Sequence, residues 1–331
     1  MKFFIKSFLF TQFLFSFLFA KGQAALADSL FHPDSLRHIV AVLASDSLEG
    51  RFAGTAGNLK AALFIAEEFR KAGLSHLAGN NGFFMQVKPS WFNVMGAIKG
   101  KSRPGQVIIF SAHYDHVGTI NTNPYPKIAG GQSDVENGDE IYNGANDNAS
   151  GVCAVVSLAK YFNAINNNER TLIFVAFTGE ELGLLGSKYL ADDCEPDSII
   201  AMINIEMIGR GQSHNPRPFV TGYEKSNLVD ILNRNYRSLA GQISEKEFFR
   251  IDRYPNEFLF TRSDNFPFAA KGIPAHSIQV TSPDDKFYHN LNDETETLNF
   301  KLMKKVIYAI ALGSTGLVTG TDTPTRIRKI N

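Results

Sequence analysis

Five short polar motifs follow or interrupt apolar segments of the 331-residue sequence, and each carries a side chain that can bind a metal or move a proton. The first motif, Ser111–His116, holds His113 and Asp115, which an extended chain points to the same side. A histidine with a carboxylate beside it suits a metal ligand and the group that orients it. A polar loop that happens to hold two histidines is the alternative for this motif alone.

The next three motifs supply carboxylates. Asp147 lies among small, turn-forming residues directly before an apolar helix, where an aspartate also serves as a cap. Glu180 and Glu181 follow an apolar strand: one of two such glutamates can ligate a metal while the other takes a proton from water, although helix N-termini also favour acids. Glu206 ends another apolar strand, where an unpaired carboxylate is costly, although a surface turn would also accommodate it.

The fifth motif supplies a second nitrogen ligand, His289, directly after Tyr288. Each motif taken alone has an ordinary structural explanation. Together, two histidines and four carboxylates near strand ends match the ligands of zinc, which commonly leaves one position open for water. If one carboxylate bridges, such a set can hold two metals about 3.5–4 Å apart. The sequence therefore predicts a metal site.

The elements that must position these motifs alternate between strand and helix. This alternation favours a single-domain α/β fold, a three-layer α/β/α sandwich with a mostly parallel, mixed central sheet, which binds ligands at the carboxyl ends of its strands. The long polar segment 119–142 is expected to be a functional loop. Strands are expected at residues 83–87, 93–98, 106–112, 171–177, 199–205 and 274–280, and helices at residues 34–45, 58–72, 149–163, 182–190, 226–239, 263–271 and 300–317.

Composition narrows the class of protein. With 44% hydrophobic and 20% charged residues, the chain is neither disordered nor fibrous. Its 33 basic and 33 acidic side chains balance, which argues against a nucleic-acid binder. Cys153 lies in an apolar helical segment and Cys194 in a polar loop, so we expect both to be free.

Residues 1–27 have the pattern of a secretory signal peptide. Two lysines precede an uncharged apolar run at residues 7–20, and a small-residue cleavage site comes directly before Asp28. The apolar run is shorter than the roughly 20 residues of a bilayer span, which favours cleavage over a membrane anchor. We expect export to the periplasm or the outside of the cell, a catalytic domain at residues 28–318 and a frayed polar tail at residues 319–331.

The motifs and their order resemble those of the di-zinc aminopeptidases of metallopeptidase family twenty-eight, clan MH, relatives of bacterial leucyl aminopeptidases. The resemblance extends from about Leu36 to Leu298 and adds Leu48-Glu49-Gly50-Arg51 to the motifs above. It implies the zinc exopeptidase fold, which is phosphorylase/hydrolase-like. It also implies two zinc ions, with Asp147 bridging both and the remaining ligands divided between them: Glu181 and His289 on one, His113 and Glu206 on the other.

The resemblance also implies the roles of the other site residues. Glu180 would be the general base that activates the bridging water and passes its proton to the leaving amine, and Asp115 would orient His113. The second metal would hold the free α-amino group of a peptide substrate, which makes such an enzyme an aminopeptidase. Asp264 and Tyr288 are expected beside the substrate or behind the ligands. Glu206 replaces the family's usual aspartate, which would loosen the second site or admit cobalt or manganese.

Three other functions remain compatible with these residues. Glutaminyl cyclases look like the same fold with one zinc, but Asn146–Gly151 has the peptidase form and Tyr288 stands where the cyclases have tryptophan. A binding ectodomain of this fold would have lost ligands. A carboxypeptidase would need a basic group for the substrate carboxylate; Arg210 is expected in a structural ion pair instead. The other candidates for binding the substrate carboxylate are Arg250 and Arg262. A separate prediction is an apolar pocket for the substrate side chain, suggested by Phe248, Phe249, Tyr254 and Phe258.

Overall fold

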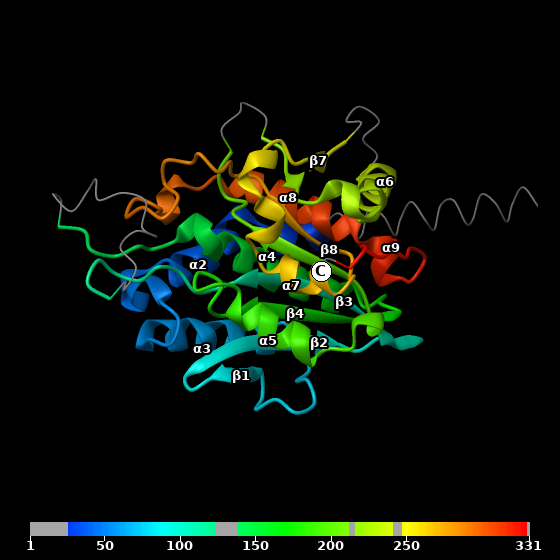
Figure 1. Ribbon diagram of the computed structural model, residues 1–331, viewed down its shortest axis with the longest axis horizontal. Coiled ribbons are helices and arrows are strands. Elements are labelled where there is room, and N and C mark those ends of the chain that lie inside the picture. Colours follow the sequence, from blue (N-terminus) through cyan, green and yellow to red (C-terminus); the bar gives the residue numbers. More distant parts are fainter. Residues whose placement is uncertain (1–25, 123–137, 212–215, 241–246, 330–331) are drawn as a thin grey trace, which may run out of the picture.

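An eight-stranded mixed sheet forms the middle layer of the protein (Figure 1). The computed structural model describes residues 26–122, 138–211, 216–240 and 247–329. Within them, the strand order is β1-β2-β4-β3-β5-β8-β6-β7. The strands are β1 (Phe84–Lys88), β2 (Trp91–Ile98), β3 (Arg103–His113), β4 (Arg170–Phe177), β5 (Ile199–Glu206), β6 (Phe219–Val220), β7 (Arg250–Ile251) and β8 (Ala275–Gln279).

The centre of the sheet is parallel, as predicted. Strands β4, β3, β5 and β8 pair in parallel, whereas β1, β2 and β6 add antiparallel pairings towards the two edges. Alternate residues of each central strand face opposite layers: Phe110 and Phe174 stack on one face with ring centroids 5.5 Å apart, while Ile109 and Val175 pack on the other. Burial on both faces explains why the sequences of these strands are continuous apolar runs.

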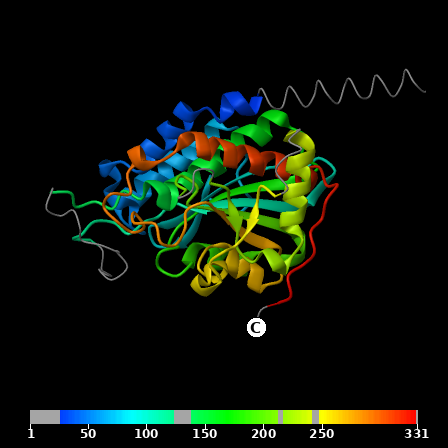
Figure 2. The same cartoon turned by 90° about the horizontal axis from the view of Figure 1, so that it is seen from above.

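Helices cover both faces of the sheet, which confirms the predicted α/β/α sandwich (Figure 2). Helix α4 lies between the sheet and two outer helices, α2 and α8, so it is apolar on almost every side. One face carries α2 (Pro33–Leu43), α3 (Ala56–Lys71), α4 (Ser150–Ile165), α6 (Leu228–Ala240), α8 (Phe300–Gly313) and α9 (Thr315–Val318), and the other carries α5 (Leu185–Asp193) and α7 (Asn265–Ala270).

Two strands were missed, and several predicted elements differ from the structure. Strands β6 and β7 were not predicted, because two residues are too few to show a periodic pattern. The helix predicted at residues 300–317 is interrupted at Ser314 and forms α8 and α9. The prediction of a frayed tail is wrong for residues 319–329. Ile327 is 5% exposed, and its backbone N–H donates to the Gly272 carbonyl at 3.1 Å. The Arg326 side chain donates to the Ile199 carbonyl at 2.7 Å.

The remaining predictions about the chain concern its cysteines and its N-terminus. Cys153 and Cys194 are both free, as predicted. Among the described residues, we find no helix with the length and hydrophobicity that crossing a membrane requires. Residues 1–25 of the predicted signal peptide and residues 123–137 of the polar segment lie outside the described residues.

Candidate metal centre

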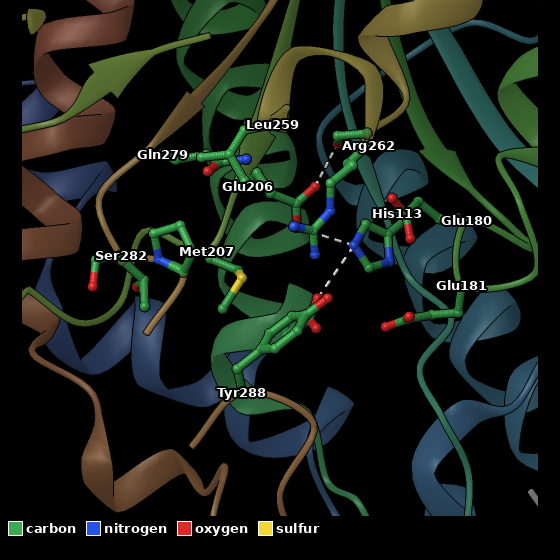
Figure 3. Close-up of a pocket in the computed structure, with 14 residues that line it drawn as sticks. His113, Glu180, Glu181, Glu206, Met207, Leu259, Arg262, Gln279, Ser282 and Tyr288 are labelled. Carbon is green, nitrogen blue, oxygen red and sulfur yellow. Dashed lines mark hydrogen bonds and ion pairs between the residues drawn. The ribbon is translucent and has the colours of Figure 1, made fainter. Parts of the chain in front are cut away.

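The predicted ligands lie where the parallel strands end. Strand β3 ends on His113 and β5 ends on Glu206, while the turn that leaves β4 carries Glu180 and Glu181. Neighbouring parallel strands end at the same edge of a sheet, so these side chains meet although 93 residues separate the first from the last. They line one pocket, with Glu180 and Glu181 on the opposite side from Met207 (Figure 3). This is the edge at which open α/β sheets bind ligands.

Asp147 stands between two groups of potential ligands. One carboxylate oxygen, Oδ1, lies 3.3 Å from Nε2 of His113, and the other, Oδ2, lies 3.1 Å from Nε2 of His289. The backbone N–H groups of Asn146 and Asp147 both donate to the Asp293 carboxylate at 3.0 Å, which fixes the turn before α4. Burial disfavours ionisation, but hydrogen bonds from the two histidines hold the pKa of Asp147 well below 3.8. Each oxygen of an ionised Asp147 thus faces a different group of potential ligands.

The first group consists of His113, Asp147 and Glu206, of which Figure 3 labels His113 and Glu206. Nε2 of His113 lies 3.0 Å from Oε1 of Glu206, so the longer glutamate side chain reaches the same point as its partners. The Ser263 hydroxyl donates to the other Glu206 oxygen at 2.7 Å. Nδ1 of His113 donates a hydrogen bond to the backbone carbonyl of Asp115 at 3.1 Å, which leaves Nε2 facing the site.

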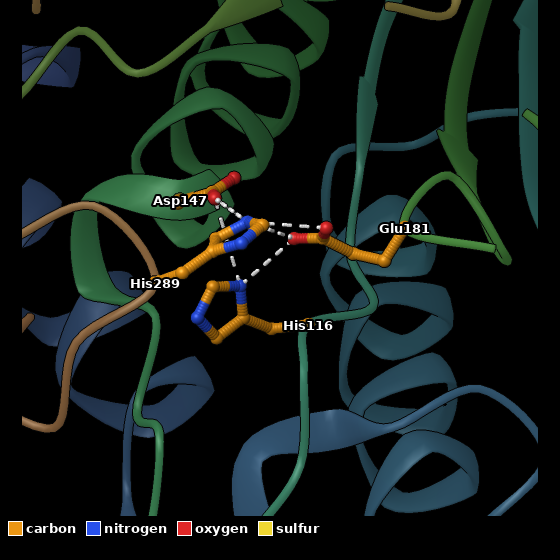
Figure 4. A group of neighbouring side chains, drawn as sticks. All are labelled: His116, Asp147, Glu181 and His289. Carbon is orange, nitrogen blue, oxygen red and sulfur yellow. Dashed lines mark hydrogen bonds and ion pairs between the residues drawn. The ribbon is translucent and has the colours of Figure 1, made fainter. Parts of the chain in front are cut away.

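The second group consists of Asp147, Glu181, His289 and His116 (Figure 4). Nε2 of His289 lies 3.1 Å from Oε2 of Glu181, and Nδ1 of His116 lies 3.1 Å from Oε1. Although burial opposes it, the charge of His289 lowers the pKa of Glu181 to about 2. His116 was not among the ligands predicted from the sequence, although it is the second histidine of the motif that contains His113.

The donor set fits zinc. Each group offers imidazole nitrogen and carboxylate oxygen, the ligands that zinc takes in proteins, and the donor atoms within each group lie within 4.8 Å of one another. The ion pairs of Asp147, Glu181 and Glu206 are with histidines, and the three carboxylates are buried or nearly so. Buried carboxylates that converge in this way are costly unless a cation joins them.

Glu180 differs from the adjacent Glu181. Burial raises the pKa of Glu180 well above 4.5 and Glu181 raises it further, although His113 opposes the shift. The backbone N–H groups of both glutamates donate to the Asp115 carboxylate, at 3.2 and 3.3 Å, and thereby hold the turn. The Asp115 carboxylate lies 3.9 Å from Nδ1 of His113, and burial raises the pKa of Asp115 to about 6. Adjacent groups with diverging pKa values are the arrangement that acid–base chemistry uses.

Arg51 holds the loops beneath the ligands, a role the sequence analysis did not assign to it. Its buried guanidinium donates to the carbonyls of Tyr114 at 2.8 Å, Asn143 at 2.6 Å and Gly144 at 2.9 Å, and also to Leu43. Burial lowers the pKa of Arg51 to about 10, so it stays charged at neutral pH. One side chain therefore ties the loop after β3 to the loop before Asp147.

The pocket beside the ligands has a volume of about 530 Å³, its open mouth included. Tyr288 stacks on the His289 ring with centroids 3.9 Å apart, and burial raises the pKa of Tyr288 well above 10, so its phenol keeps its proton. Asp264 is fully buried and is not among the residues that line the pocket; burial raises the pKa of its carboxyl to about 7. Among the described lining residues, Arg262 alone carries a guanidinium or ammonium group.

The other candidate pocket residues lie elsewhere. Arg210 pairs with Asp285 and Asp293, each at 2.7 Å, which confirms the predicted structural ion pair. The suggested apolar pocket is wrong in its residues: Phe248 and Phe249 are buried in the main core, Tyr254 packs on Phe219, and Phe258 is 70% exposed. Aromatic loop residues often pack in a core, and the apolar lining consists instead of Met207, Leu259, Pro283 and Tyr288.

A protein-family model and curated relatives both match this chain. The model of Peptidase family M28 matches residues 93–313, which include every predicted metal ligand. A probable zinc metalloprotease from Pyrenophora tritici-repentis is 34% identical over 275 residues, which cover 71% of this chain and 58% of that protein. The chain spans less than two thirds of the length of the first curated relatives that it matches.

Solved structures show the same fold. BSAP, a zinc aminopeptidase from Bacillus subtilis, gives a TM-score of 0.66 at 16% identity, covering 91% of this chain and 98% of that chain. The glutaminyl cyclase of Porphyromonas gingivalis gives a TM-score of 0.64 at 16% identity, covering 87% of this chain and 99% of that chain. With the family model matched across the strands and loops that carry the site, this chain belongs to peptidase family M28.

Proposed function

We propose that this protein is a zinc-dependent aminopeptidase that binds two zinc ions and hydrolyses the N-terminal bond of peptides. The observation that carries the proposal is the position of Asp147, whose two oxygens face two separate groups of ligands. The names of similar proteins, a probable zinc metalloprotease and a zinc aminopeptidase, support it. Cobalt or manganese in the group that contains Glu206 would be a variation of the same site.

The side chains around the site divide the steps of hydrolysis among them. Zinc bound there would supply a polarised carbonyl and a water of lowered pKa. Glu180, whose pKa is raised, lines the pocket and would accept the proton of that water and return it to the leaving amine. Tyr288 lines the same pocket and keeps its phenolic proton, so it can donate to the oxygen on which charge develops.

The pocket offers little to hold the carboxyl end of a peptide. Four acidic side chains line it, against one guanidinium among the described lining residues. Three of the four, Asp147, Glu181 and Glu206, would be neutralised by the metal they hold, so binding of a terminal carboxylate would depend on Arg262, whereas zinc beside Glu206 would hold a free α-amino group. Likeness of fold does not separate aminopeptidase from glutaminyl cyclase, because the two solved structures have TM-scores of 0.66 and 0.64.

The test compares free and blocked substrates. The zinc-loaded protein is assayed with a panel of aminoacyl-anilides and with the same compounds acetylated on the α-amino group. We expect hydrolysis of the free compounds only, abolished by a chelator and restored by zinc. Equal hydrolysis of acetylated anilides would contradict aminopeptidase activity. Failure of every anilide, with conversion of N-terminal glutaminyl peptides, would point to the cyclase.

We also propose export, on the pattern of residues 1–27 alone. The 331-residue chain is expressed in a bacterium, the periplasmic and cytoplasmic fractions are separated, and the protein is sequenced from its N-terminus. We expect to find it in the periplasmic fraction. The expected first residue is Asp28. A protein that keeps Met1 and stays with the cytoplasmic fraction would contradict export.

A further inference from the structure

His116 is a buried histidine to which the proposed mechanism gives no role. It lies three residues beyond His113, after the end of β3, and its side chain is inaccessible to solvent. Nδ1 lies 3.1 Å from Oε1 of Glu181 and 3.7 Å from Oδ2 of Asp147. Nε2 of His289 faces the same two oxygens, at 3.2 and 3.1 Å. Two imidazole nitrogens and two carboxylate oxygens therefore converge on one point (Figure 4).

A core histidine held for structural reasons has partners on both ring nitrogens, whereas among the described residues His116 has one on Nδ1 alone. The other ring nitrogen, Nε2, is buried and has no hydrogen-bond partner among the described residues. The backbone also packs closely on the ring, since a Cβ at Gly144 would lie 2.5 Å from its Cδ2. The ring is thus held with its one engaged nitrogen directed at the two carboxylates.

We infer that His116 is a metal ligand and that the two metal sites are unequal. This inference rests on the proposed di-zinc function and assigns a ligand to it. The Glu181 site then has four protein donors, two imidazoles and two carboxylates, the count of closed zinc sites. The Glu206 site has three donors, His113, Asp147 and Glu206, the count of sites with an open position. The Glu181 site fills first and retains its ion, whereas the Glu206 site exchanges its ion and is open to substrate.

The first experiment is a zinc titration of the metal-free protein by calorimetry, for the wild type, His116→Ala and the control His38→Ala, which removes an exposed histidine of α2. Wild type and control are expected to show two binding steps. In His116→Ala the tighter step should weaken at least about tenfold while the weaker step is unchanged. An unaltered tighter step in a folded His116→Ala protein would overturn the inference.

The second experiment uses the wild type alone, so it does not depend on whether the variant folds. X-ray absorption spectroscopy of the fully zinc-loaded protein counts imidazoles around the metal. Three imidazoles for two zincs are expected, from His113, His289 and His116, and two would overturn the inference even if aminoacyl-anilides are hydrolysed. Three imidazoles in a protein that cleaves no peptide would uphold the ligand and contradict only the proposed activity.

Discussion

At the scale of single residues, Glu180 and Glu181 show how the environment separates two identical side chains. Their backbone N–H groups share one acceptor, the Asp115 carboxylate. Yet the pKa of Glu180 is raised by burial and by its neighbour, whereas His289 holds the pKa of Glu181 at about 2 against the effect of burial. One glutamate is suited to carry a proton and the other to remain an ionised ligand.

Glu180→Gln tests this division of roles. The amide cannot accept a proton, so kcat should fall by about 10²–10⁴-fold while both zinc ions stay bound. The measurements are zinc content and anilide hydrolysis, with Glu224→Gln, a change in the short helical turn Tyr223–Lys225, as the control. Full activity in Glu180→Gln would remove Glu180 from the role of base, and loss of zinc would make it a ligand instead.

Ser263→Ala tests whether the Glu206 site is held separately. The Ser263 hydroxyl donates to Glu206 at 2.7 Å and accepts from the Asn204 amide at 2.8 Å. Removing it frees the carboxylate to turn, so the weaker zinc-binding step should lose about tenfold in affinity and the tighter step should not change. Ser263→Thr, which keeps the hydroxyl, should bind zinc in both steps with the affinities of the wild type. Equal weakening of both steps would show that the sites are not independent.

The sequence identified the side chains that converge in the candidate site better than the residues that position them. A histidine or glutamate at the end of an apolar strand is conspicuous, because burial there is costly without a partner. Arg51 was not identified, because its role depends on segments distant in the chain: its guanidinium reaches carbonyls 92 and 93 residues away. A motif shows which residue types are present but not which loop each side chain will reach.

At the scale of elements, the central strands were predicted nearly to their ends, because burial on both faces gives a continuous apolar run. The short strands β6 and β7 were not, because their pairing depends on contacts with β8 and not on a local pattern. The turn after β4 was predicted as the start of a helix, yet α5 begins only at Leu185. That delay leaves Glu180 and Glu181 in a turn fixed by Asp115.

Strand β8 contains a histidine that makes stability depend on pH. His276 donates through Nδ1 to the Thr221 carbonyl at 2.9 Å and accepts through Nε2 from the Ser226 hydroxyl at 2.7 Å, a pattern that requires the neutral ring. Burial lowers the pKa of His276 to about 4, while Thr221 opposes the shift. The unfolded chain, with a histidine pKa of about 6.5, therefore binds a proton more readily than the folded one.

This difference predicts loss of stability as the pH falls from about 6.5 towards 4. Between pH 7 and pH 5, His276 should cost the folded protein about 2 kcal/mol of unfolding free energy. Urea unfolding at both pH values should show that His276→Gln loses about 2 kcal/mol less than the wild type, and that His38→Gln loses as much as the wild type. The same acid loss in His276→Gln and in the wild type would assign the effect to other groups.

At the scale of the whole molecule, the sandwich brings five distant segments together at one edge of the sheet. The alternation of strand and helix was enough to predict that architecture and the edge on which the site lies. It could not predict the docking of the C-terminal segment (Figure 2), which uses a backbone hydrogen bond from Ile327 to Gly272 and a hydrogen bond from Arg326 to the Ile199 carbonyl. Such contacts need no pattern in the sequence, because any residue can supply its backbone N–H.

The central claim is that the protein removes residues from the amino end of peptides. Mass spectrometry over time on two unblocked peptides, one beginning with leucine and one with glutamine, tests it most directly, with their N-acetylated forms as controls. We predict stepwise loss of N-terminal residues from the unblocked peptides and no change in the acetylated ones. Loss of ammonia from the glutaminyl peptide alone, or shortening from the carboxyl end, would contradict the claim.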